Sequence, residues 1–207
     1  MSVIISVIIP CFNNQQTIDE TIQSVLQQSL TNWELIIVDD GSTDESVNLI
    51  NSIIEVNNSK NIKLICQENS GPSKSRNKGA AIANGKYLLF LDADDLIHSS
   101  YLEKAVKLLE ENSQLHLVYS NAEFFEAKKG AWKLPAFSKK GLLLENSIFM
   151  SAVIRTEDFR IIGGIDETLN YIEDWELWLR LVYAFDGVYK INETLFYYRK
   201  QIGRAHV

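Results

Sequence analysis

The sequence has few of the residues that staple small folds together. It contains only 2 cysteines, 3 prolines and 3 histidines among its 207 residues. Cys11 and Cys66 form neither a CxxC pair nor a metal-ligand spacing, so we expect two reduced thiols and a cytoplasmic protein. No apolar run approaches the ~18 residues of a membrane span, and the apolar stretch before Pro10 lacks the basic flank of a signal peptide. The sequence therefore predicts neither a disulfide framework nor a membrane-spanning segment.

Basic residues are also in the minority. The chain has 20 Lys and Arg against 27 Asp and Glu, a net charge of −7, which argues against a general affinity for nucleic acid. An anionic ligand would therefore need a metal ion or a local cluster of Arg and Lys. The 46% hydrophobic and 23% charged residues are ordinary for a globular protein, and the length suits one large domain.

In the first half of the chain, apolar stretches alternate with amphipathic ones. Stretches rich in Val and Ile predict buried strands, and apolar residues at helical spacing predict helices packed on them. Thr17 and Glu20 have the spacing of a helix capping box. The βαβαβαβα order predicts a Rossmann-like, mostly parallel central sheet with helices on both faces. The expected strands are residues 2–10, 33–42, 61–67 and 86–95, and the expected helices are 17–30, 43–56, 70–85 and 99–113.

After residue 112 this alternation stops. Strands are expected at 115–127, 147–155, 187–191 and 194–199, with an apolar helix at 171–185. The Lys-rich stretch 128–141 suits a plain solvated loop, or else peripheral association with an anionic membrane surface. Residues 201–207 have no packing pattern, and we expect this tail not to be native sequence. A frayed C-terminus is the alternative.

Polar motifs follow three of the four strands in the first half. They read PCFNN, DDGSTD and DADD. Each motif alone is explained by a turn that caps the next helix. In an open α/β sheet, however, ligands bind at the carboxyl ends of the strands. Three such motifs at one edge therefore favour a ligand site.

The acidic motif Asp92-Ala93-Asp94-Asp95 directly follows an apolar strand. Two carboxylates in an Asp-x-Asp pattern suit Mg²⁺ or Mn²⁺, which needs only one or two of them beside substrate phosphates. The alternative is a set of solvated acids that cap the next helix, and for Asp95 solvation or capping is the expectation. Earlier in the chain, beside the Gly-opened start of the helix expected at 70–85, Lys74, Arg76 and Lys78 suit phosphate oxygens or simply a solvated face.

Two further acids, Glu173 and Asp174, begin the apolar helix of the second half. The helix macrodipole favours carboxylates there and should keep both ionised. One of them is then available as a general base at neutral pH. Acids that merely stabilise a helix N-terminus are the alternative.

Three stretches of the chain together resemble the inverting family 2 glycosyltransferases of the GT-A fold. They are SVIIPCFNNQQTIDETIQSVLQQSLTNWELIIVDDGSTDES, SGPSKSRNKGAAIANGKYLLFLDADD and YIEDWELWLRL. The resemblance extends from about Ser6 to Arg199. It implies a nucleotide-binding half (residues 1–98) and an acceptor half (99–200). It also implies a cofactor, Mn²⁺ or Mg²⁺, and a nucleotide-sugar donor, usually a UDP-sugar. The acceptor would be a hydroxyl of a glycan or lipid-linked sugar, in cell-surface polysaccharide synthesis at the inner face of the membrane.

The resemblance assigns roles to single residues. In such enzymes the catalytic base matches Asp174, with Glu173 beside it, and Trp175 or Trp178 is expected to shape the acceptor pocket. The direct metal ligand matches Asp94. A further metal or diphosphate contact, often a His, comes from the segment after the YYR strand, which is Lys200, Gln201 and the tail here. Among the donor-binding positions, Pro10, Cys11 and Phe12 match the loop that packs on the nucleoside, and Asp39 and Asp40 match the acids that bind the base. Arg76 matches a basic residue near the nucleotide. Asp92 and Ala93 match nucleotide-binding positions, and Asp92 also serves the metal.

Three other readings remain open. A haloacid-dehalogenase-like phosphatase would use Asp92 as nucleophile and Asp94 as general acid, but Leu96 stands where that pattern has Thr or Val. A sugar-nucleotide pyrophosphorylase would carry a Gly-rich loop after the first strand, and CFNNQQ contains no Gly. A degenerate domain that binds sugar nucleotides, or a scaffold, would not need the acids that this chain retains.

Overall fold

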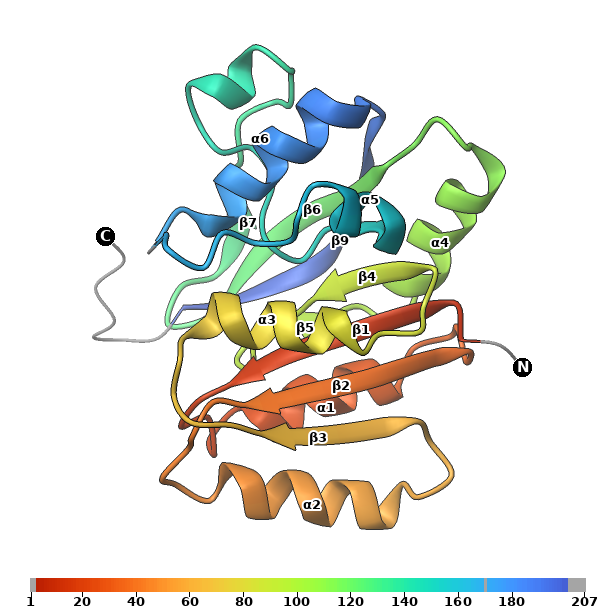
Figure 1. Ribbon diagram of the computed structural model, residues 1–207. Coiled ribbons are helices and arrows are strands. Elements are labelled where there is room, and N and C mark those ends of the chain that lie inside the picture. Colours follow the sequence, from red (N-terminus) through yellow and green to blue (C-terminus); the bar gives the residue numbers. More distant parts are fainter. Residues whose placement is uncertain (1–2, 170, 201–207) are drawn as a thin grey trace.

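A single sheet runs through the computed structural model of the protein, which describes residues 3–169 and 171–200 (Figure 1). The strand order is β3-β2-β1-β4-β8-β6-β9-β5, and β7 pairs with β6. The predicted tail, 201–207, lies outside the described residues. The strands are β1 (Ile5–Cys11), β2 (Trp33–Asp39), β3 (Ile62–Cys66), β4 (Tyr87–Phe90), β5 (Leu96–Ile97), β6 (Leu117–Glu126), β7 (Gly130–Trp132), β8 (Val153–Arg155) and β9 (Val188–Lys200).

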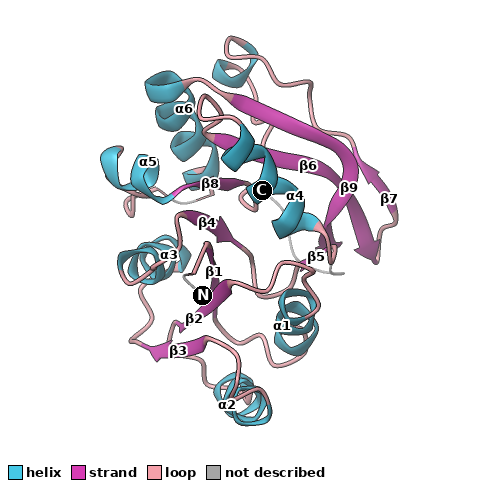
Figure 2. Cartoon of the chain, turned by 90° about the vertical axis from the view of Figure 1, so that its right-hand side faces the viewer, coloured by secondary structure: helices cyan, strands magenta, loops and turns pink. Residues whose placement is uncertain are grey.

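The first half has the predicted parallel arrangement. Strands β1 to β4 are parallel and are covered by α3 on one face and by α1 and α2 on the other (Figure 2). Every residue of β2 and of β4 is buried, as expected for strands covered on both faces. The helices are α1 (Ile18–Leu26), α2 (Ser46–Val56), α3 (Pro72–Ala81), α4 (Tyr101–Glu111), α5 (Thr156–Ile161) and α6 (Glu173–Phe185), and Gly141–Leu143 form a short 3₁₀ turn.

The second half extends this sheet with antiparallel pairs. Strand β8 pairs antiparallel with β4 and with β6, whereas β6 and β9 are parallel. Two short strands were predicted at 187–191 and 194–199, but β9 is continuous, because a bulge at Asn192 and Glu193 absorbs the break in register. Of the strand predicted at 147–155, only 153–155 is regular. Residues 147–152 are buried without forming a strand, which accounts for the apolar side chains among them.

The predicted capping box at α1 does not form. Thr17 precedes the helix without capping it, and its hydroxyl instead donates to the carbonyl oxygen of Ala93 at 2.9 Å. Glu20 pairs with Arg199. Both side chains therefore connect α1 to the acidic motif and to β9 rather than to the helix's own amides.

Helix α3 lies unusually close to β1. A Cβ on Gly79 would come within 2.5 Å of Ile8 Cγ2, so only glycine permits this approach. Arg76 stands about one turn earlier on α3, and the close packing carries its side chain to the carboxyl ends of the strands. The expected site edge and the expected basic residue are thus brought together.

Candidate active site

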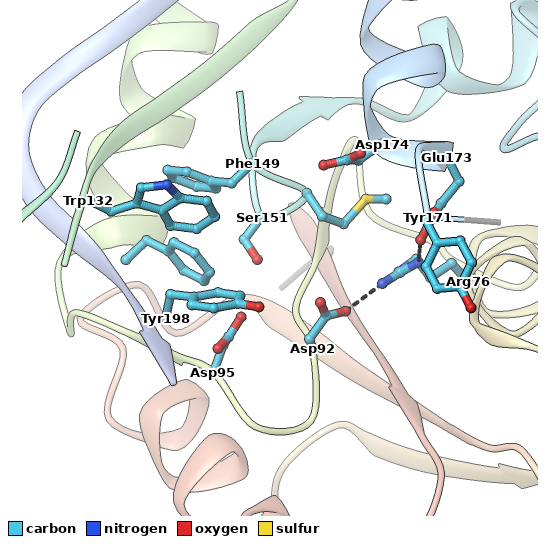
Figure 3. A pocket seen from close by; sticks show the side chains of 12 residues that line it. Arg76, Asp92, Asp95, Trp132, Phe149, Ser151, Tyr171, Glu173, Asp174 and Tyr198 are labelled. Atoms are coloured by element: carbon cyan, nitrogen blue, oxygen red, sulfur yellow. Dashed lines mark hydrogen bonds and ion pairs between the residues drawn. The ribbon is translucent and has the colours of Figure 1, made fainter. Parts of the chain in front are cut away.

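Two cavities meet at the carboxyl edge of the parallel strands, and Arg76 and Asp92 line both. The first, about 460 Å³, lies between the loops after β1 and β2 and the start of α3. The second, about 220 Å³, opens toward α6 and β9 (Figure 3). The first is lined by Pro10, Cys11, Phe12, Asn14, Asp40, Asn69, Gly71, Pro72, Ser75, Arg76, Asp92, Ala93 and Asp94. The second is lined by Arg76, Asp92, Asp95, Trp132, Phe149, Met150, Ser151, Tyr171, Glu173, Asp174, Phe196 and Tyr198.

The loop after β1 forms one wall of the first cavity, and the segment after β2 holds this loop in place. The backbone amide of Asn13 donates to the hydroxyl of Ser42 in that segment, and the amide of Asn14 donates to the hydroxyl of Ser46 at the start of α2, both at 2.9 Å. Phe12 is held with its ring 45% exposed. Both cysteines are free, and burial raises the pKa of Cys11 to about 12, so its thiol stays neutral. A rigid, uncharged surface results.

Asp40 lines the first cavity but is already hydrogen-bonded. Its carboxylate accepts the backbone amides of Ser70 at 2.9 Å and Gly71 at 2.8 Å, and the Gln67 amide at 2.7 Å. It therefore fastens the segment before α3 to the cavity. The neighbouring Asp39 accepts the backbone amide of Ser42 at 3.1 Å, while its Oδ1 is buried without a partner among the described residues. Their assignment to a nucleobase remains a prediction.

Arg76 is the charged centre of the site. Its guanidinium is buried, and it donates to Asp92 at 2.6 Å and to Glu173 at 3.1 Å. It thus joins the acidic motif to the start of α6 although these elements are far apart in sequence. The other two residues of the predicted basic cluster, Lys74 and Lys78, are exposed and line neither cavity.

The acidic motif is divided between the two cavities. Asp94 is half-buried at the first cavity, and Asp92 faces both. Solvation or capping was expected for Asp95, which is wrong: it is 2% exposed and accepts the backbone amide of Arg199 at 2.8 Å. Burial, together with the charges of Asp92 and Asp94, raises the pKa of Asp95 well above its ordinary value.

Arg199 holds the motif from behind. Its Nε donates to the carbonyl oxygen of Asp94 at 2.6 Å, and its two terminal nitrogens pair with Glu20 and Glu126. Strand β9 therefore contributes to the site although the Arg199 side chain lines neither of the two cavities. Sequence reasoning gave this arginine no role, because nothing local to it signals the contact.

Asp174 lies in the second cavity, at the start of α6 (Figure 3). Its carboxylate accepts the backbone amide of Trp175 at 2.7 Å and the Asn146 amide at 3.0 Å. The macrodipole was expected to keep it readily ionised, but desolvation by burial dominates and raises its pKa to about 6. It still titrates below neutral pH, in the range suited to a general base.

The predicted tryptophans do not shape this cavity. Trp178 is fully buried in the core, and Trp175 donates from its ring nitrogen to the carbonyl oxygen of Leu142 at 2.6 Å. Trp132 and Tyr198 line the cavity instead. Trp132 lies within the Lys-rich stretch 128–141, in which no motif was recognised. The one signal that could have indicated its role was an isolated tryptophan among lysines.

The acidic motif fits a divalent cation in part. Among the described residues no three His, Cys, Asp or Glu side chains cluster as a complete site. Asp94 and Asp92 nevertheless offer oxygen ligands beside the larger cavity, and Mg²⁺ typically takes only one or two carboxylates when phosphates complete its shell. Within the described part of the chain, no helix has the length and apolar character to cross a membrane.

Comparison with known proteins matches residues 6–164 to the family described as Glycosyl transferase family 2. An uncharacterized glycosyltransferase of Haemophilus influenzae is 36% identical over 165 residues, covering 77% of this chain and 65% of that protein. S. aureus TarS 1-349 in complex with UDP-GlcNAc is 24% identical with a TM-score of 0.83, covering 99% of this chain and 62% of that one. A Pyrobaculum calidifontis mannosyltransferase in complex with GDP-Man and Mn²⁺ is 18% identical with a TM-score of 0.76, covering 96% and 57%. The chain thus spans under two thirds of the length of these proteins.

Proposed function

The chain belongs to glycosyl transferase family 2 and has the expected GT-A fold, and from this premise we propose that it transfers a sugar from a nucleotide-diphosphate donor to an acceptor hydroxyl with inversion. The observation that carries the proposal is the placement of Asp174. It lines the cavity that adjoins the proposed donor cavity, across the Arg76–Asp92 pair. A base beside a donor pocket is the arrangement that a single displacement needs.

In the proposed reaction, the acceptor oxygen attacks the anomeric carbon from the face opposite the diphosphate. Asp174 takes the proton of that hydroxyl as the new C–O bond forms, and the bond to the diphosphate oxygen breaks with its electron pair leaving on the nucleotide. The buried Arg76 contributes positive charge beside the departing diphosphate. A pKa of about 6 leaves Asp174 ionised at neutral pH, yet basic enough to accept a proton.

The donor is proposed to lie in the first cavity. The rigid surface formed by Pro10, Cys11 and Phe12 offers an apolar contact for the nucleoside, and Asp39 and Asp40 lie at the adjoining strand end. Asp94 and Asp92 would hold Mn²⁺ or Mg²⁺, which when bound neutralises the charge that builds on the leaving diphosphate. A UDP-sugar is the donor we favour, because TarS is similar in fold and was solved with UDP-GlcNAc.

The acceptor and the cellular setting are proposed from family membership alone. We propose that the acceptor is a hydroxyl of a glycan or lipid-linked sugar, and that transfer takes place at the inner face of the membrane in cell-surface polysaccharide synthesis. Because the chain belongs to glycosyl transferase family 2, the interpretation as a haloacid-dehalogenase-like phosphatase is set aside. The non-catalytic alternative conflicts with a base and a donor cavity retained side by side.

The test separates donor binding from chemistry. Asp174→Asn should abolish transfer while leaving the affinity for UDP in Mn²⁺ within about twofold, measured by calorimetry and by UDP release. Glu176→Gln is the matched control, because Glu176 is on the same helix but pairs with Arg180 and lines neither cavity. It should keep full activity.

Two results would count against the proposal. If neither UDP nor GDP binds with metal present, there is no donor site. If Asp174→Asn keeps normal turnover, Asp174 is not the base. For the metal, Asp94→Ala should weaken UDP binding at least tenfold in Mn²⁺ but little in EDTA, and an equal loss in both conditions would remove Asp94 as a ligand.

A further inference from the structure

The second cavity has an aromatic wall that the proposed reaction does not explain. The rings of Trp132 and Tyr198 lie 4.8 Å apart and are tilted by 54°. Trp132 is also stacked on Phe124, with ring centroids 5.3 Å apart and planes at 27°. Phe149 and Phe196 form a second stacked pair at 4.4 Å. Because each ring is held by another, the wall is fixed before any ligand arrives.

The cavity is also lined by acids. Asp92, Asp95, Glu173 and Asp174 all line it, and among the described residues Arg76 is the only basic one that does so. The guanidinium of Arg76 is already paired with Asp92 and Glu173. Figure 3 places Trp132 and Tyr198 on one side and Arg76 with Glu173 on the other, with Asp92 and Asp174 between them. Even without Asp95, the carboxylates of Asp92, Glu173 and Asp174 outnumber the single cation. The charge of a metal ion held by Asp92 and Asp94 would be offset by the diphosphate that it binds, so the field in the cavity is negative.

The cavity is also small. Its volume of about 220 Å³ lies below the roughly 300–1,000 Å³ of sites for drug-sized ligands. It has room for one ring rather than an extended oligosaccharide. Asp174 faces this cavity and not the first one, so the ring that brings its hydroxyl to the proposed base belongs here.

We propose that the second cavity binds one uncharged sugar ring of the acceptor against Trp132 and Tyr198, and discriminates against rings that carry a carboxylate or phosphate. This inference rests on the proposed function and adds its acceptor class. The C–H face of a pyranose suits the negative face of an aromatic ring, and its hydroxyls can donate to the facing carboxylates. An anionic substituent would instead enter a negative field, which is a repulsive device for specificity. An amino sugar is tolerated by the same reasoning.

The experiment compares matched ligands by saturation-transfer NMR on the whole protein with UDP and Mn²⁺. Methyl glucoside, galactoside and mannoside are set against their uronates and 6-phosphates, so that the members of each series share one ring and differ only in the group on C6. The neutral rings should bind at least tenfold better than their anionic counterparts, with saturation on the ring protons. Binding of the anions as tight as that of the neutral rings, or no binding of any neutral ring, would overturn the inference.

Variants locate the bound ring. Trp132→Ala should lower the affinity for the neutral ring at least fivefold, and Trp132→Phe should restore much of it. Tyr189→Ala, an exposed aromatic outside both cavities, should change nothing. UDP affinity should be unchanged in all three variants, which also shows that they fold. If Trp132→Ala weakens UDP-sugar binding as much as ring binding, the wall serves the donor and the inference is wrong.

Failure of the proposed function is separately visible. UDP titration of the unmodified protein is done first, without any glycoside. If the unmodified protein does not bind UDP, the proposed donor site is wrong. If it binds UDP normally but does not prefer neutral over anionic sugar rings, only the inference about the acceptor is wrong.

Discussion

Asp174 combines the position proposed for the catalytic base with an unfavourable environment. Burial raises its pKa from the ordinary 3.8 to about 6, so the proposed base is protonated in mildly acidic solution. We expect kcat/KM for transfer to fall below about pH 6 with a slope of one proton, measured as UDP release between pH 5 and 8. Glu176→Gln should show the same acid limb. A flat profile down to pH 5 would contradict the role of Asp174.

The same shift has a consequence for folding. Because the folded state binds this proton more tightly than the unfolded state, stability falls as pH rises from about 4 to about 6. Asp174→Asn removes that cost, and should raise the free energy of unfolding at pH 7.5 by up to about 3 kcal/mol. Urea titrations at pH 7.5 and pH 4 measure it, with no gain expected at pH 4. A destabilised variant at pH 7.5 would show that the carboxylate is not strained by burial.

Asn146 lowers the pKa of the proposed base, Asp174. Its amide donates to Asp174 at 3.0 Å and lowers the pKa of that carboxyl. In Asn146→Ala the acid limb should therefore move to higher pH, with the KM for the donor unchanged. A drop in kcat without movement of the limb would mean that Asn146 only supports the local backbone.

Single residues were also where sequence reasoning was weakest. The motif around Asp92 was found from the end of an apolar strand, and Asp174 from the start of an apolar helix, because local sequence carries that information. The burial of Asp95, by contrast, is produced by β9, which follows it by about a hundred residues in the chain. Trp132 reaches the cavity only through the pairing of β7 with β6. Neither long-range contact has a local signature.

At the level of elements, β9 supports the acidic motif through Arg199. Arg199→Gln removes the partner of Glu20 and Glu126 and a donor to Asp94. We expect a loss of about 2 kcal/mol in the free energy of unfolding, below the 3–5 kcal/mol of fully buried pairs because both glutamates are partly exposed. The affinity for UDP in Mn²⁺ should also fall, by about tenfold.

Arg155 provides the matched control. It too bonds several backbone carbonyls, those of Leu109, Asn112 and Leu115, but at the end of α4 away from both cavities. Arg155→Gln should lower stability without changing UDP affinity. If both arginine variants lose only stability, Arg199 has no special relation to the donor site.

For the elements themselves, the parallel half was predictable throughout and the second half only in part: β6 and α6 lie where they were expected, but β8 and β9 differ from the prediction. Apolar strands and helices recur at regular intervals up to β4, so each is signalled locally. The buried segment 147–152 has the same composition as a strand, and the bulge at Asn192 and Glu193 joins two predicted strands into one. In both cases the deciding contacts come from other parts of the sheet.

On the scale of the whole molecule, the two proposed halves share one sheet. Strand β4 pairs with β8, β5 pairs with β9, and Arg199 contacts α1. We expect one cooperative unfolding transition. In Trp33→Phe, the three remaining tryptophans all lie in the second half, so fluorescence reports that half while far-UV circular dichroism reports both. Their midpoints should coincide, and separated midpoints would show independent domains.

The place of β9 in the chain has a consequence for synthesis on the ribosome. Residues 5–90, which contain the parallel strands β1 to β4, can form their local units early, since chains fold from the N-terminus as they emerge. The buried Asp95, however, obtains the backbone amide of Arg199 only once residue 199 has left the exit tunnel. The parallel pairing of β6 with β9 also closes a long loop, which is slow. A nascent chain would thus carry an unsupported acidic motif until residue 199 has emerged, and the proposed donor site would be complete only at that point.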